Sequence, residues 1–341
     1  MRLSREVRSS WVAYAVWLVS LLACTAAEDS AKSAAAEPPL VLTATITLPD
    51  VTGRIDHLTL DTKRRRLYVA ALAHGTVEVV DLAKGAWLRR SAGFDEPQGI
   101  AYLADVDRVA VGCGGDGTVH LLDGESSLSA GRVDLGDDTD NVHYAAAEKR
   151  LWAAFGNGGL AAIDPSTQKE SGRVALDAHP EGFALEASGK RAFVNLASKA
   201  EVAVVDRASF RVTARWKVEG ASSNYPMALD EAGKRLYVGC RSPARLIVLS
   251  TEDGRTVASA PCTDDPDDIF VDAARRRVHV VCGGGSVDVF DLGESGPKLR
   301  AKVPTAAGAR TGLLDAASGV LWVAVPRRGG RSAEIRVYEP R

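Results

Sequence analysis

Short apolar stretches alternate with polar or glycine-rich turns along most of the chain. Arg66-Leu-Tyr-Val and Thr76-Val-Glu-Val-Val-Asp81 are typical apolar stretches, and Gly112-Cys-Gly-Gly-Asp-Gly117 is a typical turn. Short runs rich in β-branched residues and bounded by glycines predict β-strands. No stretch after residue 40 shows the 3.6-residue apolar period of an amphipathic helix. The pattern therefore predicts an all-β protein.

One strand pattern recurs at intervals of 41 to 44 residues. A basic residue followed by an apolar strand begins at Arg66, Arg108, Arg150, Arg191, Arg235 and Arg277, and a seventh copy without the arginine begins at Val320. A second strand follows each copy, and in five copies it ends in an aspartate, namely Asp81, Asp123, Asp164, Asp206 and Asp291. We expect these carboxylates to accept backbone N–H bonds from the next turn. Four short strands repeated every ~40–45 residues are typical of a β-propeller blade.

The two ends of the repeat region complement each other. The seventh repeat reaches Arg341 after only three strands, and the segment Leu40–Leu48 supplies one further strand ahead of the first repeat. Pairing these ends closes the ring and removes exposed sheet edges. We expect residues 40–341 to form a single seven-bladed β-propeller of four-stranded blades, with the N-terminal strand completing the last blade.

The first residues have the order of an export signal. Three arginines within the first eight residues precede the apolar stretch Trp11–Ala23, which is too short to span a bilayer comfortably. Residues 1–23 are therefore expected to be a signal peptide. The tetrad ending at Cys24 resembles a bacterial lipobox, which predicts lipidation of Cys24, with residues 24–39 as a flexible tether. Cleavage near Thr25–Ala27 without a lipid is the alternative.

Either form of processing predicts an extracytoplasmic protein, in the periplasm or cell envelope. Membrane contact is then expected only through the N-terminal lipid. The chain has 42 Lys and Arg against 44 Asp and Glu, and only 6% aromatic residues. This balance argues against nucleic-acid binding. Motifs of common hydrolases, metalloproteases and nucleoside triphosphatases are also absent from the sequence.

Four cysteines follow Cys24, and none belongs to a Cys-x-x-Cys pair. They are Cys113, Cys240, Cys262 and Cys282. Their spacing does not predict a zinc or iron–sulfur site. An oxidising compartment would permit a disulfide, for which Cys240–Cys262 is the local pair, but isolated buried thiols agree equally well with the pattern. The histidines on predicted strands, His120, His143 and His279, are expected to be packed.

The repeat also places residues around the ring axis. Ten residues before each strand marker lies a polar side chain: Asp56, Gln98, Asp140, Glu181, Tyr225, Asp267 and Arg310. The next position adds His57, Asn141 and Asp268, and we expect His179, Asn224 and Arg241 at the same level. Both positions fall at the start of the innermost strand, so these residues should surround one mouth of the central channel.

Five acids in this ring, Asp56, Asp140, Glu181, Asp267 and Asp268, form the candidate metal site. Crowded carboxylates cannot all stay charged unless a bound cation, nearby arginines or protonation offsets them. If a cation binds, an oxygen-rich set fits calcium better than zinc. Three interpretations stay open for the ring: hydrogen bonds between blades around water, a site for a small polar or ionic ligand, and catalysis.

The repeats resemble a known family. Arg66-Leu-Tyr-Val-Ala and Arg235-Leu-Tyr-Val-Gly are similar to the YVTN-type repeats of bacterial β-propellers, and the segment Gly53–Asp61 resembles the first blade of an exported subgroup. The resemblance implies an extracytoplasmic binding or scaffolding propeller. It supplies no catalytic residues, because propellers have many unrelated functions.

The leading hypothesis is therefore a non-enzymatic binding or scaffold propeller, whose partner is an unidentified protein or small polar ligand. The second is a metal-dependent lactonase or other hydrolase that uses the same mouth. There a metal would polarise a carbonyl, while Asp56 with His57, or His179 with Glu181, moves a proton. A third hypothesis, accessory binding in a redox quinoprotein system, follows from the family association alone.

Overall fold

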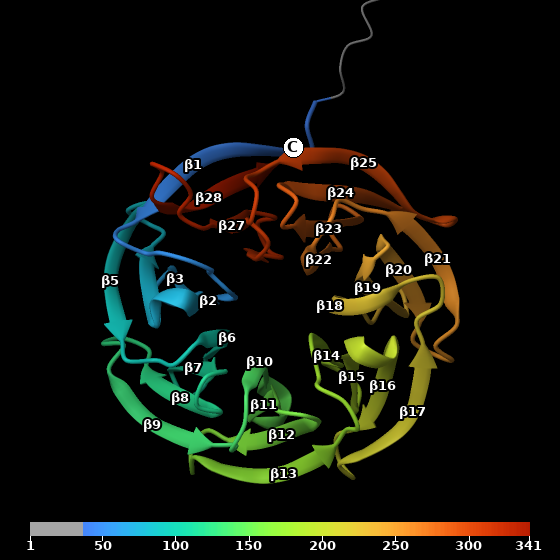
Figure 1. Cartoon of the computed structure of the whole chain (residues 1–341), viewed down its shortest axis with the longest axis horizontal. Coiled ribbons are helices and arrows are strands. Elements are labelled where there is room, and N and C mark those ends of the chain that lie inside the picture. Colours follow the sequence, from blue (N-terminus) through green and yellow to red (C-terminus); the bar gives the residue numbers. More distant parts are fainter. Residues whose placement is uncertain (1–36) are drawn as a thin grey trace, which may run out of the picture. The chain divides into compact units, whose positions relative to one another are not determined.

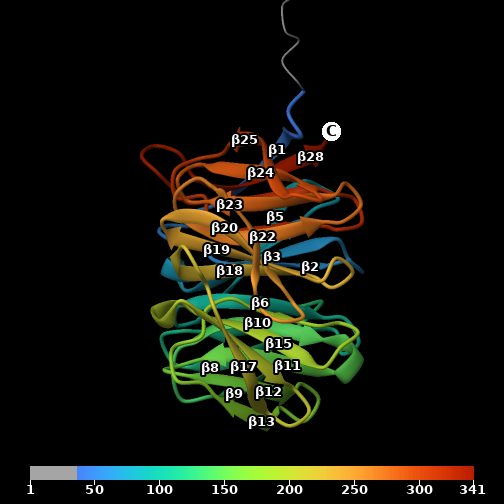
Figure 2. The same cartoon turned by 90° about the vertical axis from the view of Figure 1, so that its right-hand side faces the viewer.

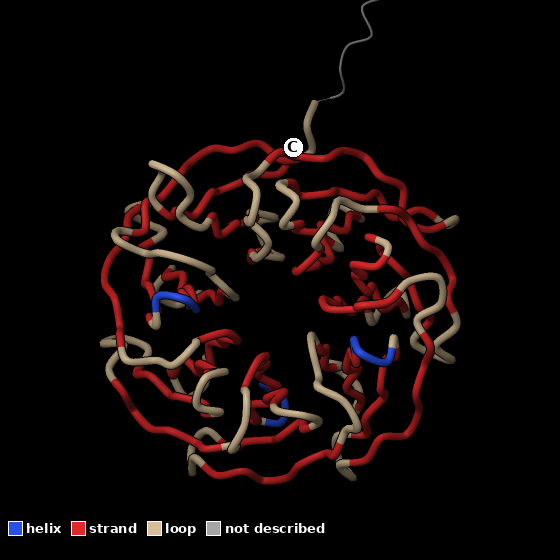
Figure 3. Tube along the Cα trace, viewed as in Figure 1, coloured by secondary structure: helices blue, strands red, loops and turns tan. Residues whose placement is uncertain are grey.

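The protein is a ring of seven antiparallel four-stranded sheets (Figure 1). The computed structural model describes residues 37–341, so the predicted signal peptide, Cys24 and most of the predicted tether lie outside the described residues. The strands account for nearly all regular structure (Figure 3). The predicted seven-bladed β-propeller is confirmed.

The strands fall into four layers from the axis outward. The innermost strands are β2 (Leu58–Asp61), β6 (Pro97–Leu103), β10 (Thr139–Ala145), β14 (Phe183–Leu185), β18 (Ser222–Asp230), β22 (Pro266–Asp272) and β26 (Gly312–Leu314). The second strands are β3 (Arg66–Ala71), β7 (Arg108–Cys113), β11 (Arg150–Phe155), β15 (Arg191–Leu196), β19 (Arg235–Ser242), β23 (Arg277–Cys282) and β27 (Leu321–Val325). The third strands are β4 (Thr76–Asp81), β8 (Thr118–Asp123), β12 (Gly159–Asp164), β16 (Glu201–Asp206), β20 (Ala244–Ser250), β24 (Ser286–Gly293) and β28 (Ala333–Pro340). The outer strands are β5 (Ala86–Ala92), β9 (Ser129–Asp134), β13 (Lys169–Ala175), β17 (Arg211–Lys217), β21 (Thr256–Pro261), β25 (Gly296–Pro304) and β1 (Leu40–Leu48).

Each blade uses four consecutive strands except the last. Blade 1 comprises β2–β5, the blades that follow take four strands each, and blade 7 joins β26–β28 to β1. Single 3₁₀ turns η1 (Leu72–His74) and η3 (Ala197–Lys199) connect second and third strands, and η2 (Ala146–Glu148) connects the first and second strands of blade 3. Seen from the edge of the ring, the strands run across its thickness (Figure 2). Within residues 37–341, no helix has the length and apolar character needed to cross a membrane.

The second and third strands form the core because both of their faces are covered. The second strands in particular are almost continuously buried, as in Leu67–Ala71 of β3. Each apolar cluster spans two neighbouring blades. Phe193 and Trp216 of blade 4, for example, pack in one cluster with Leu236 and Val238 of blade 5. A strand buried on both faces reads as a continuous apolar run rather than an alternating one.

The aspartates at the ends of the third strands cap the following turns, as predicted, in four of the five copies. Asp81 accepts N–H bonds from Ala83 and Lys84, both at 3.0 Å, and these bonds lower the pKa of its carboxyl. Asp123, Asp164 and Asp206 make equivalent bonds. Asp291 differs, because its carboxylate lies 3.3 Å from the Arg300 guanidinium instead. Four of these five aspartates therefore stabilise the next turn by the same backbone hydrogen bonds, and Asp291 is the exception.

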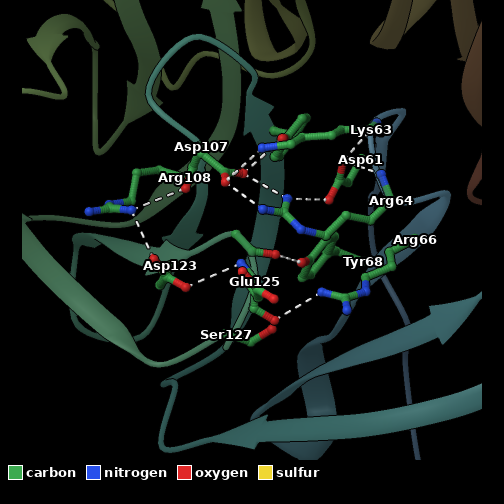
Figure 4. Close-up of polar contacts among 12 residues, drawn as sticks. Asp61, Lys63, Arg64, Arg66, Tyr68, Asp107, Arg108, Asp123, Glu125 and Ser127 are labelled. Carbon is green, nitrogen blue, oxygen red and sulfur yellow. Dashed lines mark hydrogen bonds and ion pairs between the residues drawn. The ribbon is translucent and has the colours of Figure 1, made fainter.

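Ion pairs join neighbouring blades at the end of β2 that is remote from Asp56 (Figure 4). Arg64 donates to Asp61 at 2.9 Å and to the two oxygens of Asp107 in blade 2 at 2.8 and 2.5 Å. The bond from Arg64 holds the pKa of Asp107 well below its usual range. Arg66, one of the repeated arginines, reaches the Glu125 carbonyl of blade 2 at 2.9 Å. Arg64 and Arg66 therefore help to fix blade 1 against blade 2.

Three of the four described cysteines occupy the same place in their blades. Cys113, Cys240 and Cys282 each lie near the end of a second strand and are fully buried, whereas Cys262 follows β21 and is half-buried. All four are free thiols in the structure. Burial raises the pKa of Cys113 and of Cys240 to about 12. Cys113 therefore agrees with the alternative of an isolated buried thiol, whereas Cys262 lies near Cys282 and raises the pKa of the Cys282 thiol.

His279 in β23 should make the fold sensitive to acid. Its side chain is fully buried, and neither ring nitrogen has a hydrogen-bond partner among residues 37–341. Burial lowers the pKa of His279 from 6.5 to about 4. The unfolded chain therefore binds the proton more tightly, so stability is complete above pH 6.5 and falls as the pH drops toward 4, by up to about 3 kcal/mol.

The His279→Leu variant should lose this component of the pH dependence. We expect its unfolding free energy to fall less than that of the parent protein between pH 7 and pH 4, as measured by urea titration at each pH. His74→Gln is the matched control, because the His74 ring lies near the surface beside Thr52. Parallel pH profiles of the parent and His279→Leu would contradict the prediction.

Candidate functional site

A cavity of about 520 Å³ occupies the channel at the mouth where the innermost strands begin. Nearly all of the predicted ligand residues line it: Asp56, His57, Gln98, Asp140, Asn141, His179, Glu181, Tyr225, Arg241, Asp267, Asp268 and Arg310. Asn224 does not. Its side chain is fully buried and donates to Asn195 Oδ1 at 2.8 Å and to the Glu201 carbonyl at 2.9 Å. Asn224 therefore ties blade 5 to blade 4.

The innermost strands of neighbouring blades pack closely against each other around the cavity. Gly99 and Gly182 lie where a Cβ atom would meet a neighbouring backbone: 2.4 Å from the Asp140 carbonyl oxygen and 2.6 Å from that of Tyr225, respectively. Gly182 also donates its N–H to the Tyr225 carbonyl at 3.1 Å. These glycines let the first strands of adjacent blades approach, which brings the polar side chains of successive repeats together.

We call the first group of charged residues the His57 corner: Arg54, Asp56, His57 and Asp268. His57 bridges two carboxylates, with Nε2 3.5 Å from Asp56 Oδ1 and Nδ1 3.5 Å from Asp268 Oδ1. Burial opposes protonation of His57, but Asp268 and Asp56 outweigh it and raise the pKa of His57 to about 10. Burial raises the pKa of Asp56, against the attraction of His57 and of Arg54, whose Nη2 lies 2.7 Å away. Two cations here balance two acids.

The second group is the arginine corner: Arg241, Asp265, Asp267 and Arg310. Arg241 stacks 3.8 Å from the centroid of the Tyr225 ring, pairs with Asp267 and lies 3.1 Å from Asp265. Arg310 completes the pairing at 2.9 Å from Asp265. Burial raises the pKa of Asp267 to about 7 against the pull of Arg241. This corner is also balanced, with two arginines facing two aspartates.

The third group is the acidic corner: Asp138, Asp140, His179 and Glu181. Donor atoms of Asp140, His179 and Glu181 all lie within 4.8 Å of one another. His179 Nδ1 lies 2.7 Å from the Gly156 carbonyl, and its Nε2 lies 3.9 Å from Asp140 Oδ2. The Asp140 carboxylate raises the pKa of His179 to about 9, and burial together with Asp140 raises the pKa of Glu181 to about 7.

The acidic corner has more acids than bases. With all three carboxylates ionised, they face one imidazolium, a formal charge of −2, and burial together with the neighbouring Asp140 raises the pKa of Asp138 and of Glu181. Within residues 37–341, no arginine or lysine lies within ion-pair distance of Asp138, Asp140 or Glu181. Elsewhere in the ring, the arginines and the protonated His57 offset the acids. Of the five carboxylates predicted to crowd together, Asp56, Asp267 and Asp268 therefore have cationic partners at ion-pair distance. In the part of the chain that the structure describes, Asp140 has only His179 as a partner at that distance, and Glu181 has no arginine or lysine there.

The donor chemistry of the acidic corner differs from the predicted five-acid metal set. Only Asp140 and Glu181 of that set converge, and they do so with the imidazole of His179. A proton on Nδ1 bonded to the Gly156 carbonyl would leave Nε2 free to bind a metal, the usual arrangement of a metal-binding histidine. An imidazole beside two carboxylates fits zinc or manganese better than calcium.

Three charged residues of the site were not predicted from the sequence. Arg54, Asp138 and Asp265 all line or border the mouth and take part in its ion pairs or acidic corner. Each lies twelve residues before its strand marker, two positions ahead of the polar column, and His179 occupies the same position in blade 4. Extending the internal alignment by two positions would have identified them.

His143 departs from the expectation of a packed strand histidine. Its ring contacts Phe183 edge-on, with centroids 4.5 Å apart, but the side chain remains exposed to the cavity and contributes to its lining. His143 thus adds an imidazole to the cavity lining, on the same strand as Asp140.

Comparison with known proteins identifies the fold only. No protein-family model matches the chain, and no curated protein matches it, so the YVTN resemblance stays a prediction. A chain from the crystal structure of the mitotic checkpoint complex is similar, with a TM-score of 0.75 and 13% identity over 88% of this chain and 91% of the other. Hydrazine synthase of Kuenenia stuttgartiensis gives a TM-score of 0.73 and 17% identity over 83% of this chain and 94% of the other.

Proposed function

We propose that the chain is an exported binding propeller, without a reaction of its own, that takes a compact cationic ligand at the acidic corner. The carrying observation is that, of the three corners, only the acidic corner has no arginine or lysine among the described residues within ion-pair distance of its carboxylates, Asp138, Asp140 and Glu181. A buried excess of carboxylate is stabilised by a bound cation. The other two corners carry their own counter-ions and would hold the rim in place around the ligand.

The size and polarity of the cavity support this class of ligand. A volume of about 520 Å³ lies within the range of small-molecule sites. The charged lining suits an ion or a strongly polar molecule rather than an apolar one. A divalent metal ion and an organic diamine both carry the required positive charge. The experiment must therefore show which of the two the protein binds.

Cation binding can be measured by the melting temperature, because a ligand that binds only the folded state stabilises it. We expect the Tm to rise with millimolar Mn²⁺, Zn²⁺ or putrescine. The compound that raises the Tm shows whether the ligand is a metal ion or an organic diamine. Calcium is included as the cation favoured by the sequence alone.

The double variant Asp140→Asn, Glu181→Gln should weaken binding at least ~100-fold, since it removes two direct contacts. Asp253→Asn, on an exposed loop, is the control and should bind like the parent protein. Equal Tm shifts in the double variant and the parent, or no shift with any of these cations, would overturn the proposal.

The second candidate function is a hydrolase, favoured by the Asp267 carboxyl, whose pKa is raised to about 7. A carboxyl of this kind in a cavity can exchange protons near neutral pH. Metal-loaded protein should then open simple lactones or esters, and Asp267→Asn should abolish that activity. If the parent protein turns over none of these substrates while still binding a cation, only the binding function stands.

Export is part of the proposal and has its own test. We propose that residues 1–23 are removed and that Cys24 carries a lipid, as the N-terminal sequence predicts. Mass spectrometry of the protein from a bacterial host should give a lipidated N-terminal Cys24. An unmodified N-terminus beyond Cys24 would refute the lipid.

A further inference from the structure

The third strands of two blades carry a buried acid in the same place. Glu78 in β4 and Asp288 in β24 are both the third residue of their strands and are fully buried. In blade 1, Thr76 donates to Glu78 at 2.7 Å, and Arg90, its register partner, donates at 2.6 Å. Blade 6 repeats this with Ser286, Asp288 and Lys302 at 2.6 and 3.6 Å. The repeat thus contains a buried acid held by a hydroxyl and a base.

Blade 2 keeps the hydroxyl and the base but replaces the acid with histidine. His120 occupies the third position of β8 and lies opposite Arg132 in register. A guanidinium cannot form an ion pair with an imidazole, and burial lowers the pKa of His120. Its Nε2 is buried and has no hydrogen-bond partner among residues 37–341. Arg132 instead lies 3.8 Å from Asp116 Oδ2.

The same hairpin brings two further metal-binding side chains to His120. Cys113 ends β7 opposite Thr118, and alternate residues of a strand share a face, so Thr118 and His120 are on one side of β8. Asp116 lies in the connecting turn, where Thr118 donates to its Oδ1 at 2.6 Å. Donor atoms of Cys113, Asp116 and His120 lie within 4.8 Å of one another. No residue of this group belongs to the acidic corner.

We propose that Cys113, Asp116 and His120 form a second metal site, for zinc or a metal of similar softness. Thiolate, carboxylate and imidazole are all zinc ligands, and three of them leave a fourth position for water. The bound Zn²⁺ displaces the thiol proton of Cys113, which passes to solvent, so one thiolate and one carboxylate neutralise the ion. The metal would also bind His120 Nε2, which has no hydrogen-bond partner among residues 37–341. Blades 1 and 6 have an acid at this position where blade 2 has the histidine.

The surroundings already hold two of the three ligands in position. Phe94 packs edge-on against the His120 ring with centroids 5.2 Å apart. Thr118 orients the Asp116 carboxylate, as residues behind a metal ligand usually do. The equivalent cysteine of blade 6, Cys282, has the acid Asp288 where blade 2 has His120. Blade 6 is therefore the internal control.

Cobalt(II) titration of the whole chain can separate this site from the acidic corner. A cysteine ligand produces thiolate-to-cobalt charge-transfer absorption, and the acidic corner has no sulfur. In a His179→Ala background, we expect one equivalent of Co²⁺ to produce this band and Zn²⁺ to remove it. Cys113→Ser should abolish the band, and His120→Gln should weaken Co²⁺ binding at least ~100-fold.

Cys282→Ser is the matched control and should keep the band with unchanged affinity. Circular dichroism without metal establishes that each variant is folded, and His120→Gln decides the result if Cys113→Ser is not. Absence of the band in folded parent protein, or its persistence in Cys113→Ser, would overturn the proposal. Because His179→Ala disables only the acidic corner, a failure here leaves the proposed channel function unaffected.

Discussion

A chain that begins after Leu48 should lose cooperative folding. Strand β1 forms the outer edge of blade 7 and pairs with β28 from Leu40 opposite Pro340 to Leu48 opposite Ala333. Leu40, Ile46 and Leu48 are at most 4% exposed. Burying three such side chains contributes about 5–9 kcal/mol, which compares with the about 5–15 kcal/mol that stabilises a typical domain. The truncated chain also exposes β28 as a free edge, which favours aggregation.

A chain that begins at Glu37 is the matched control for this truncation. It keeps every contact of β1 and should melt at the same temperature as the full chain, as measured by circular dichroism. The single variant Leu48→Asp should lie between the two, because it introduces a charge into a fully buried position. If the chain beginning after Leu48 melts cooperatively within a few degrees of the control, strand β1 does not close the ring.

The fold could be predicted because each blade repeats the same local solution. The apolar run after each marker, such as Leu67–Ala71, recurs with nearly constant spacing, and a four-stranded unit of that length has few other ways to bury both faces of its second strand. The closing role of Leu40–Leu48 could be predicted because the seventh repeat has only three strands, and β1 does pair with β28. Repetition converts a weak local pattern into a strong one.

The position of the site along the channel axis could also be predicted, but the contacts within it could not. Counting along the repeat gives the blade of each residue and its position along the axis. Ion pairing depends instead on how side chains of different blades meet. Asp267 pairs with Arg241 of the preceding blade, and His57 reaches Asp268 of blade 6 across the channel mouth. The repeat position alone does not specify such neighbours.

Local irregularity added to that uncertainty at Asp140 and Asn224. The register of β10 on β11 shifts between Thr139 and Val142, and that of β18 on β19 shifts between Asn224 and Met227. A bulge of this kind redirects side chains relative to a regular strand. Asp140 lies beside His179 and Glu181, while Asn224 points between blades. Asn224 also precedes the polar column, at Tyr225, by one residue, and neighbouring residues of a strand point to opposite sides, so alternation would have placed its side chain away from the channel.

Replacing Glu78 with alanine should destabilise the protein by about 3–5 kcal/mol, the usual effect of removing one partner of a buried ion pair. Glu78 is fully buried and accepts bonds from Thr76 at 2.7 Å, Arg90 at 2.6 Å and Trp87 at 2.7 Å. Alanine leaves all three donors without this acceptor. Glu78→Gln keeps the shape but not the charge, so it should lose less, and Arg90→Ala added to Glu78→Ala should recover part of the loss. Urea midpoints at constant slope measure each step, and a loss under 1 kcal/mol for Glu78→Ala would show that the pair does not stabilise blade 1.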